Sequence, residues 1–257
     1  MFKHLAIAAL CALSTPAMAQ SSGLPVDGEL LSGWRETDGR HYSGLHLNLA
    51  PGWKTYWRAP GAGGIPPRFN WSGSRNLARV DVVYPVPKVM VQNGLKSIGY
   101  DDDVIFPLIV YARDSSAPVT LRGEIEIGVC EEVCIPMTLQ LAATLPAGGQ
   151  HDAGISAGMQ NQPVKAGAFD CEISPISDGL RLRAETQSAH IATEIAVIET
   201  ATPDVWVSAS EMKQNGVSLV AEVEMVPPSA QPFALARSGV RMTLIGGGQA
   251  IELEGCR

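Results

Sequence analysis

The sequence predicts an all-β protein with two β-sandwich domains after a cleaved signal peptide. Apolar residues alternate with polar ones in many short runs, and Gly and Pro punctuate the intervals between these runs. No stretch of the first domain shows a convincing 3.6-residue period of apolar residues. Short alternating strands with regular turn signals are typical of a β-sandwich. The expected division is a signal peptide at 1–19, a first domain at 24–146, a linker at 147–163 and a second domain at 164–257.

The amino terminus has the composition of a secretory signal peptide. Lys3 provides a basic start, an apolar run extends to Leu13, and Ala17-Met18-Ala19 is a small-x-small cleavage site. No later segment approaches the roughly 20 apolar residues that span a bilayer. We therefore expect an exported protein with no membrane span of its own. Four of the five cysteines follow this segment, in an oxidising compartment where disulfides persist.

Strands are expected wherever alternation is bounded by turn residues. In the first domain these are 45–49, 53–58, 68–71, 80–84, 104–111 and the two flanks of a cysteine pair. A linker rich in Gly follows, with a short helix before Pro163. In the second domain the expected strands are 169–173, 180–185, 194–198, 205–208, 217–225, 240–245 and 251–254. Seven strands suffice for a small sandwich.

Cys130 and Cys134 stand between two alternating runs. The apolar residues of both flanks occupy odd positions: Val119, Leu121, Ile125, Ile127, Val129, Ile135, Met137, Leu139 and Leu141. In a straight strand the two cysteines would lie about 13 Å apart, whereas a disulfide needs Cα atoms within about 7 Å. If the sulfurs meet, the pair therefore forms the tip of a β-hairpin. Both cysteines occupy even positions, so their sulfurs should lie off the main core face.

The other two cysteines, Cys171 and Cys256, bracket the second domain. In the chain-entropy model, joining them contributes about 4.5 kcal/mol, against about 2 kcal/mol for the Cys130–Cys134 ring. We therefore expect a structural disulfide between Cys171 and Cys256. The tight Cys130–Cys134 ring stabilises the fold little, and from the residues alone an ordinary hairpin disulfide and a redox-active one both remain open.

Composition argues against several other functions. The formal net charge is −7 and no Lys/Arg cluster exists, so nucleic acid is not an expected partner. His41 and His46 lie on opposite faces of an expected strand, and no metal site or cofactor is expected. One alternative function is copper binding, because two cysteine sulfurs with Met90 or Met137 nearby could hold Cu(I). A second alternative is a structural accessory module with inert disulfides.

Three segments occur in the same order in one known family. They are 50–58 (APGWKTYWR), 98–108 (IGYDDDVIFPL) and 128–136 (GVCEEVCIP). In these segments the chain resembles the amino-terminal periplasmic domain of the DsbD transmembrane thiol reductases. The spacing of its cysteines resembles the ScsB branch, named for suppression of copper sensitivity. The resemblance covers 26–145 strongly and extends weakly over the rest.

The resemblance implies an immunoglobulin-like fold and a periplasmic location. It also implies a redox-active disulfide at Cys130 and Cys134, which takes electrons that cross the inner membrane and passes them to periplasmic thioredoxin-fold proteins. A loop shields the cysteines in this family. The matching stretch is 89–99, with Val91, Asn93 and Gly94 as its shielding or docking residues, and Tyr56 matches an aromatic near the pair.

This chain departs from its full-length relatives in several ways. It has neither the membrane conduit nor the thioredoxin-like domain, so a separate inner-membrane electron-transfer protein is the expected donor. Its shielding stretch also lacks the aromatic often found there. The negative charges of Glu131 and Glu132 disfavour a thiolate. Of the two cysteines, Cys130 is expected to form the mixed disulfide with a partner.

Overall fold

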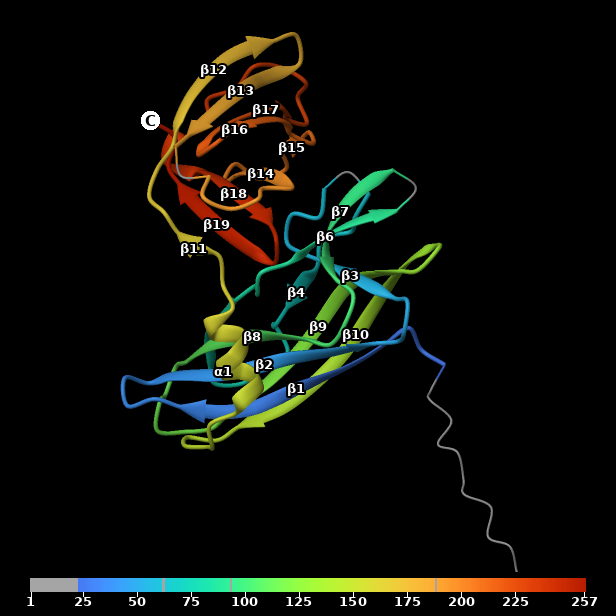
Figure 1. The fold of residues 1–257 in the computed structure, drawn as a ribbon. Helices are drawn as coiled ribbons and strands as arrows, with labels where there is room; N and C mark the ends of the chain where they lie inside the picture. Colours follow the sequence, from blue (N-terminus) through green and yellow to red (C-terminus); the bar gives the residue numbers. More distant parts are fainter. Residues whose placement is uncertain (1–22, 62, 93, 188) are drawn as a thin grey trace, which may run out of the picture.

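The computed structural model describes residues 23–61, 63–92, 94–187 and 189–257. The predicted signal peptide at 1–19 lies outside the described residues. The described chain is nearly all β, with one short α-helix, and the predicted all-β fold is confirmed. Figure 1 shows two sandwiches, the first in blue to green and the second in orange to red.

The first sandwich has two antiparallel sheets. One sheet has the order β1–β2–β8–β5: β1 (Val26–Arg35), β2 (Arg40–Leu49), β8 (Val104–Ala112) and β5 (Leu77–Val82). The other has the order β10–β9–β3–β7–β6: β10 (Cys134–Leu145), β9 (Val119–Cys130), β3 (Lys54–Tyr56), β7 (Leu95–Tyr100) and β6 (Lys88–Gln92). A short strand, β4 (Arg68–Asn70), also pairs with β9. Apolar side chains from both sheets fill one continuous core between them.

β1 is a strand that sequence alternation does not indicate. Its register on β2 shifts between Leu31 and Trp34, and Gly33 in this bulge has a φ of 61°. A β-bulge adds one residue to a strand and thereby reverses the parity of inward-facing positions. The apolar residues of β1 therefore do not follow one period-two pattern.

The range predicted as a linker, 147–163, folds onto the first sandwich. Its helix α1 (Ala153–Gln160) begins at Asp152, whose side chain accepts a hydrogen bond from the backbone N–H of Ile155 at 2.9 Å. Ile155 is fully buried and packs beside Gly44 of β2, where a Cβ would come within 3.0 Å of it. The helix of this range therefore packs on the first sandwich.

The second sandwich also has two sheets. One has the order β11–β19–β18–β14: β11 (Val164–Lys165), β19 (Gln249–Glu254), β18 (Val240–Gly246) and β14 (Ile195–Thr200). The other has the order β12–β13–β17–β15: β12 (Asp170–Ile176), β13 (Gly179–Thr186), β17 (Ser218–Val226) and β15 (Trp206–Val207). β16 (Glu211–Asn215) pairs with β17. A single turn of 3₁₀ helix, η1 (Arg237–Gly239), precedes β18.

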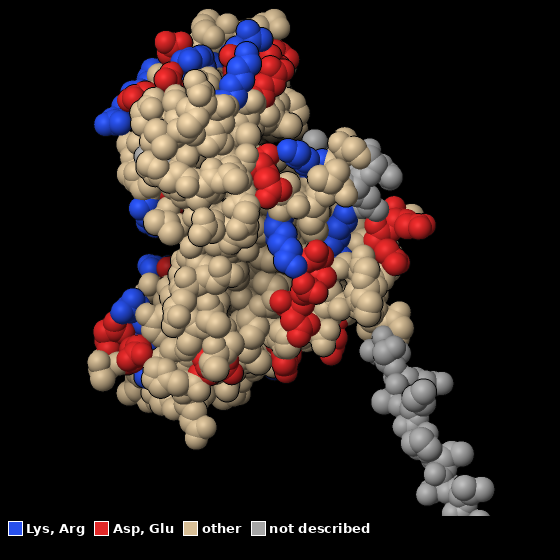
Figure 2. All heavy atoms as spheres, in the orientation of Figure 1, with Lys and Arg blue, Asp and Glu red and all other residues tan. Residues whose placement is uncertain are grey.

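The two sandwiches pack directly on each other. Ile245 and Ala250 of the second sandwich are buried in the apolar core of the first. Lys96 of β7 donates to the backbone carbonyl of Glu194 at 2.8 Å. The space-filling view shows the two lobes in contact, with acidic and basic side chains interspersed over the face drawn (Figure 2). The second sandwich therefore sits against the β6–β7 side of the first.

β2 carries a buried histidine. The His41 side chain is fully buried, and its Nε2 lies 2.5 Å from the carbonyl oxygen of Ser32. Burial lowers the pKa of His41 below its ordinary value of 6.5, and the nearby Arg35 lowers it further, against the opposing effect of the Ser32 hydrogen bond. His41 is therefore held neutral in the folded protein.

We expect the folding stability to fall as the pH drops below about 6.5. The unfolded chain protonates His41 near pH 6.5, whereas the folded chain resists protonation, so the unfolded state binds more protons in this range. The stability from neutral His41 is present above pH 6.5 and is lost as the pH falls toward the lower folded-state pKa. One proton changes the free energy of unfolding by at most about 1.4 kcal/mol per pH unit.

Urea unfolding at pH 7.5 and pH 5.5 measures this loss. His41→Gln should reduce the pH dependence, and His190→Gln should not, because His190 is exposed. An unchanged pH dependence in His41→Gln would contradict the assignment.

Candidate functional site

Cys130 and Cys134 lie directly opposite each other at the tip of the β9–β10 hairpin. Cys130 ends β9, Cys134 begins β10, and the register pairs one with the other. Their Cα atoms are 4.1 Å apart and their sulfurs form a disulfide. The chain turns at Glu131, Glu132 and Val133, as the hairpin interpretation requires. The pairing continues along twelve residues of each strand, so the disulfide stands at the end of a long rigid ribbon.

The two cysteines differ in exposure. Cys130 is 1% exposed, whereas Cys134 is exposed. Parity on β9 places Cys130 on the face away from the apolar core, as the sequence predicts. It is nevertheless buried, because side chains outside the core cover it on that second face. A partner can therefore reach Cys134 and cannot readily reach Cys130.

Tyr56 of β3 makes the polar contact with the disulfide. Its hydroxyl lies 2.8 Å from the Sγ of Cys130 and 3.4 Å from the Sγ of Cys134. Sulfurs in a disulfide carry no hydrogen, so the hydroxyl is the donor. Burial raises the pKa of Tyr56 above its usual value of 10, which keeps the hydroxyl protonated. The predicted proximity of Tyr56 to the cysteine pair is found in the structure.

A short segment after β3 covers the Tyr56 ring. We call Pro60, Gly63, Gly64 and Ile65 the tyrosine cover. A Cβ on Gly64 would lie 2.8 Å from the Tyr56 ring and 2.3 Å from the Cβ of Pro60. Gly63 offers its carbonyl oxygen to the Tyr56 hydroxyl at 3.5 Å. The cover leaves Tyr56 only 2% exposed.

Glycine in β9 makes room for this cover. A Cβ on Gly128 would come within 2.6 Å of the Cβ of Ile65. Thr55, next to Tyr56, donates its hydroxyl to the Gly128 carbonyl at 2.9 Å and so fixes β3 on β9. Gly128 and Gly64 are therefore needed because side chains at these positions would push the cover off Tyr56.

The surface around Cys134 is apolar with an acidic turn. Val133 is 71% exposed, and Ile135 and Ile65 are also exposed. Glu131 and Glu132 form the exposed turn between the cysteines. Exposed apolar side chains beside a reactive group are typical of a protein-docking surface.

The stretch expected to shield the cysteines is a regular β-hairpin, made by β6 and β7. β3 lies between it and β9. Tyr56 aligns with Gly99 and Gly99 with Lys88, so Val91, three residues after Lys88, faces the other side of the sheet from Tyr56. Gly94 is exposed at the hairpin tip, and Asn93 lies outside the described residues. A shielding role for this hairpin stays a prediction.

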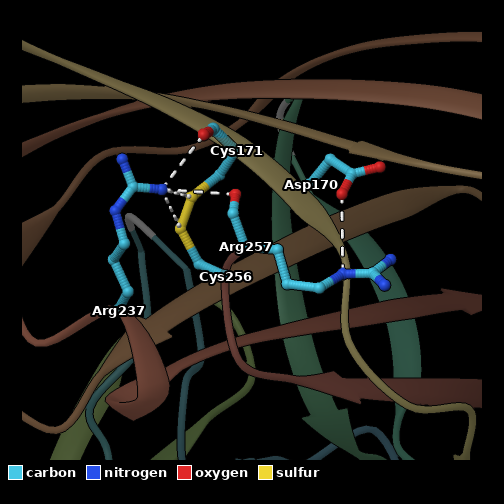
Figure 3. Close-up of a disulfide and its surroundings, with 5 residues drawn as sticks. All are labelled: Asp170, Cys171, Arg237, Cys256 and Arg257. Carbon is cyan, nitrogen blue, oxygen red and sulfur yellow. Dashed lines mark hydrogen bonds and ion pairs between the residues drawn. A yellow bond between two sulfur atoms is a disulfide. The ribbon is translucent and has the colours of Figure 1, made fainter.

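Cys171 and Cys256 form the second disulfide, with Cα atoms 5.5 Å apart. Figure 3 shows Arg237 reaching over it. The Nη1 of Arg237 donates to the carbonyl oxygens of Cys171 and Arg257, each at 3.2 Å, and lies 3.3 Å from the Sγ of Cys171. Backbone hydrogen bonds pair the same two chain segments, with the N–H of Cys171 donating to the carbonyl of Arg257 at 3.1 Å. This disulfide thus joins the start of β12 to the carboxyl terminus.

The two methionines considered for copper occupy different strands. Met137 packs against the apolar core, on the opposite face of β10 from Cys134. Met90 belongs to β6, three strands from β9 in the sheet. In the described part of the chain, no group of three or more His, Cys, Asp or Glu side chains could hold a metal ion.

Sequence reasoning missed the tyrosine cover and an ion pair behind it. The glycines at 61–64 stand out in the sequence but match no known loop motif. Arg58 follows β3 and contacts Glu199 and Glu252, which lie 141 and 194 residues away. No local pattern links residues so far apart.

Comparisons with known proteins agree with this geometry. Residues 28–146 match a family model described as the N-terminal part of the thiol:disulfide interchange protein DsbD. The solved N-terminal periplasmic domain of ScsB from Proteus mirabilis has a similar fold, with a TM-score of 0.60 and 22% identity over 89% of this chain and 90% of that chain. This likeness in fold extends over both sandwiches. A comparison with curated proteins gives no match.

Proposed function

We propose that the chain is a periplasmic thiol–disulfide exchange protein, because residues 28–146 match the family model of the DsbD N-terminal domain. It carries electrons through Cys130 and Cys134 from a membrane thiol reductant to thioredoxin-fold proteins. The proposed donor is a separate inner-membrane electron-transfer protein. Among the described residues, no helix is long and apolar enough to cross a membrane. The predicted signal peptide supports export to the periplasm.

One observation carries the proposal: the exposed sulfur and the stabilised sulfur of this disulfide are different atoms. Cys134 is open to solvent, while Cys130 is buried under the Tyr56 hydroxyl at 2.8 Å. Attack on a disulfide needs access to one sulfur and a good leaving group at the other. This arrangement provides both.

Reduction begins when a thiolate of the donor attacks the Sγ of Cys134. The Cys130–Cys134 bond breaks, and Cys130 leaves with the electron pair as a thiolate that accepts the Tyr56 hydrogen bond. The donor's second thiolate then attacks the donor sulfur of the mixed disulfide and releases Cys134. Two electrons enter the hairpin, the donor becomes a disulfide, and the two hairpin thiolates take protons from solvent.

The reverse sequence reduces the acceptor. The Cys134 thiolate attacks the acceptor's disulfide and forms a mixed disulfide, and one acceptor sulfur leaves as a thiolate. Cys130 then attacks Cys134, which restores the hairpin disulfide and frees the second acceptor thiolate. The burial of Cys130 favours Cys134 as the sulfur bonded to the partner, in place of the Cys130 expected from the sequence.

The docking surface fits partners with an apolar rim around their own cysteines. Val133 and Ile135, the sequence neighbours of Cys134, and Ile65, which lies beside Gly128 of β9, expose apolar area near the hairpin tip. Glu131 and Glu132 add negative charge, which disfavours a thiolate at Cys134 in the free protein. When a partner with positive charge docks at this turn, its charge would offset the effect of the two glutamates and favour the Cys134 thiolate.

A transfer assay tests the function. The reduced protein is mixed with an oxidised thioredoxin-fold protein, and free thiols of each are followed by alkylation and mass spectrometry. We expect the reduced protein to transfer thiols to the acceptor faster than a small dithiol does at the same concentration. Transfer no faster than from that dithiol would contradict the carrier function.

A further inference from the structure

Arg58 joins the redox site to the second sandwich. It lies two residues after Tyr56, and its guanidinium donates to both carboxylate oxygens of Glu199 on β14 at 2.9–3.2 Å. Its Nη2 also donates to Glu252 on β19 at 2.7 Å. The Arg58 guanidinium therefore binds two carboxylates of the other domain at once.

This ion pair is largely shielded from solvent at the interface. The side chains of Arg58 and Glu252 are 19% and 10% exposed, and the guanidinium stacks over the Trp57 ring at 4.1 Å. Paired, two-pronged hydrogen bonds of this kind fix geometry more tightly than surface ion pairs do. Removing Arg58 leaves Glu199 partly buried without this cation, while Glu252 keeps only Arg241, whose Nε lies 3.6 Å from its carboxylate. The position of Arg58 is thus strongly determined by the second sandwich.

A continuous series of contacts leads from Arg58 to the sulfurs. The backbone N–H of Trp57, next to Arg58, donates to the Ile98 carbonyl, and the backbone N–H of Ile98 donates to the Pro60 carbonyl, each at 3.0 Å. Pro60 packs against Gly64, and Gly64 packs on the Tyr56 ring. Trp57 before Arg58 and Pro60 after it are therefore tied together through Ile98, and this link holds the tyrosine cover in place.

We propose that Arg58 is a positioning residue of the redox site, through which the second sandwich holds Tyr56 against the disulfide. This inference rests on the proposed function, and it gives the second sandwich a role in that function. Glu199 and Glu252 act on Tyr56 only through Arg58 and the tyrosine cover. None of the three touches a sulfur.

The positioning has a consequence for the redox equilibrium. A thiolate at Cys130 accepts the Tyr56 hydrogen bond more strongly than a disulfide sulfur does, because it carries a negative charge. The contact therefore stabilises the reduced hairpin relative to the oxidised one. Loss of the contact should make the disulfide harder to reduce.

A double-mutant cycle tests the inference. The equilibrium constant for reduction of Cys130–Cys134 is measured in dithiothreitol redox buffers for Arg58→Met, Tyr56→Phe and the combined variant. We expect Tyr56→Phe to lower this constant about fivefold, the difference in strength between a hydrogen bond to a thiolate and one to a neutral disulfide sulfur, and Arg58→Met to lower it by a similar factor. The combined variant should show no further loss, because both changes remove the same contact.

Arg79→Met is the matched control. Arg79 also stacks on a tyrosine, Tyr111 at 3.9 Å, and pairs with Asp81 at 2.9 Å, but it is exposed and contacts no residue of the second sandwich among those described. The equilibrium constant for reduction of Cys130–Cys134 in Arg79→Met should equal that of the wild type. Thermal unfolding of each variant separates loss of stability from a change in the equilibrium.

Two results would overturn the inference: an unchanged constant in Arg58→Met, or factors that multiply in the combined variant. If Arg58→Met does not fold, Glu199→Gln with Glu252→Gln should lower the constant in the same direction, and no change there would equally overturn it. Failure of the proposed function is a different result, since the wild-type protein would then not transfer thiols to an acceptor.

Discussion

Cys134→Ser is expected to abolish thiol transfer between this protein and its partners. The variant keeps Cys130, but that thiol is 1% exposed beneath Tyr56 and cannot meet a partner's sulfur. No mixed disulfide should form, and transfer should fall to the background of the assay. The measurement is thiol transfer to an oxidised thioredoxin-fold acceptor, with non-reducing electrophoresis for the mixed species.

Cys130→Ser should behave in the opposite way. Its exposed Cys134 can attack the acceptor's disulfide, but no second thiol is present to resolve the product, so a stable mixed disulfide through Cys134 should accumulate. Both variants lose the Cys130–Cys134 disulfide. Each therefore controls for any loss of stability in the other. A mixed disulfide that forms in Cys134→Ser and not in Cys130→Ser would contradict the assignment of Cys134 as the partner-facing sulfur.

Replacing both Cys171 and Cys256 by Ala should destabilise the second sandwich strongly. This disulfide spans 85 residues, and closing a loop of that length restricts the unfolded chain by about 4.5 kcal/mol in the chain-entropy model. Observed losses of native disulfides run from about 2 to 5 kcal/mol. The expected fall in Tm is on the order of 10 °C or more, measured by calorimetry.

Thiol transfer through Cys130 and Cys134 is the control for the Cys171 and Cys256 prediction. The Cys171→Ala, Cys256→Ala variant should still transfer thiols at a temperature where it is folded, because the second pair takes no part in exchange. Unchanged Tm would contradict the structural role of this disulfide. Lost transfer in the folded variant would contradict the separation of the two pairs.

The parts of the fold that are local in sequence were predictable. The β9–β10 hairpin follows from alternation on both sides of two cysteines, since only a turn brings the sulfurs within bonding distance. Tyr56 was placed near the pair through the family motif that contains it. The strands of the second sandwich follow from apolar alternation between turns. In each case the signal lies within about ten neighbouring residues.

The parts that depend on distant contacts were not predictable. Burial of Cys130 on the face away from the core depends on Tyr56 of β3, whose hydroxyl lies 2.8 Å from its Sγ. The alternation of residues along β9 gives the face of Cys130 but not what covers that face. The stretch expected as a loop pairs as β6 and β7 because its apolar residues reach the core and its Lys96 reaches Glu194. The Arg58 ion pair joins residues separated by most of the chain.

The central claim is that Cys130–Cys134 exchanges while Cys171–Cys256 does not, and separate reduction potentials test it most directly. Each disulfide is equilibrated with defined thiol buffers, and its reduced fraction is read by alkylation and peptide mass spectrometry. We predict a potential for Cys130–Cys134 within the range of thiol-exchange proteins, about −120 to −270 mV, and one below about −300 mV for Cys171–Cys256. A Cys130–Cys134 potential as low as that of the structural disulfide, with no partner able to open it, would contradict the account.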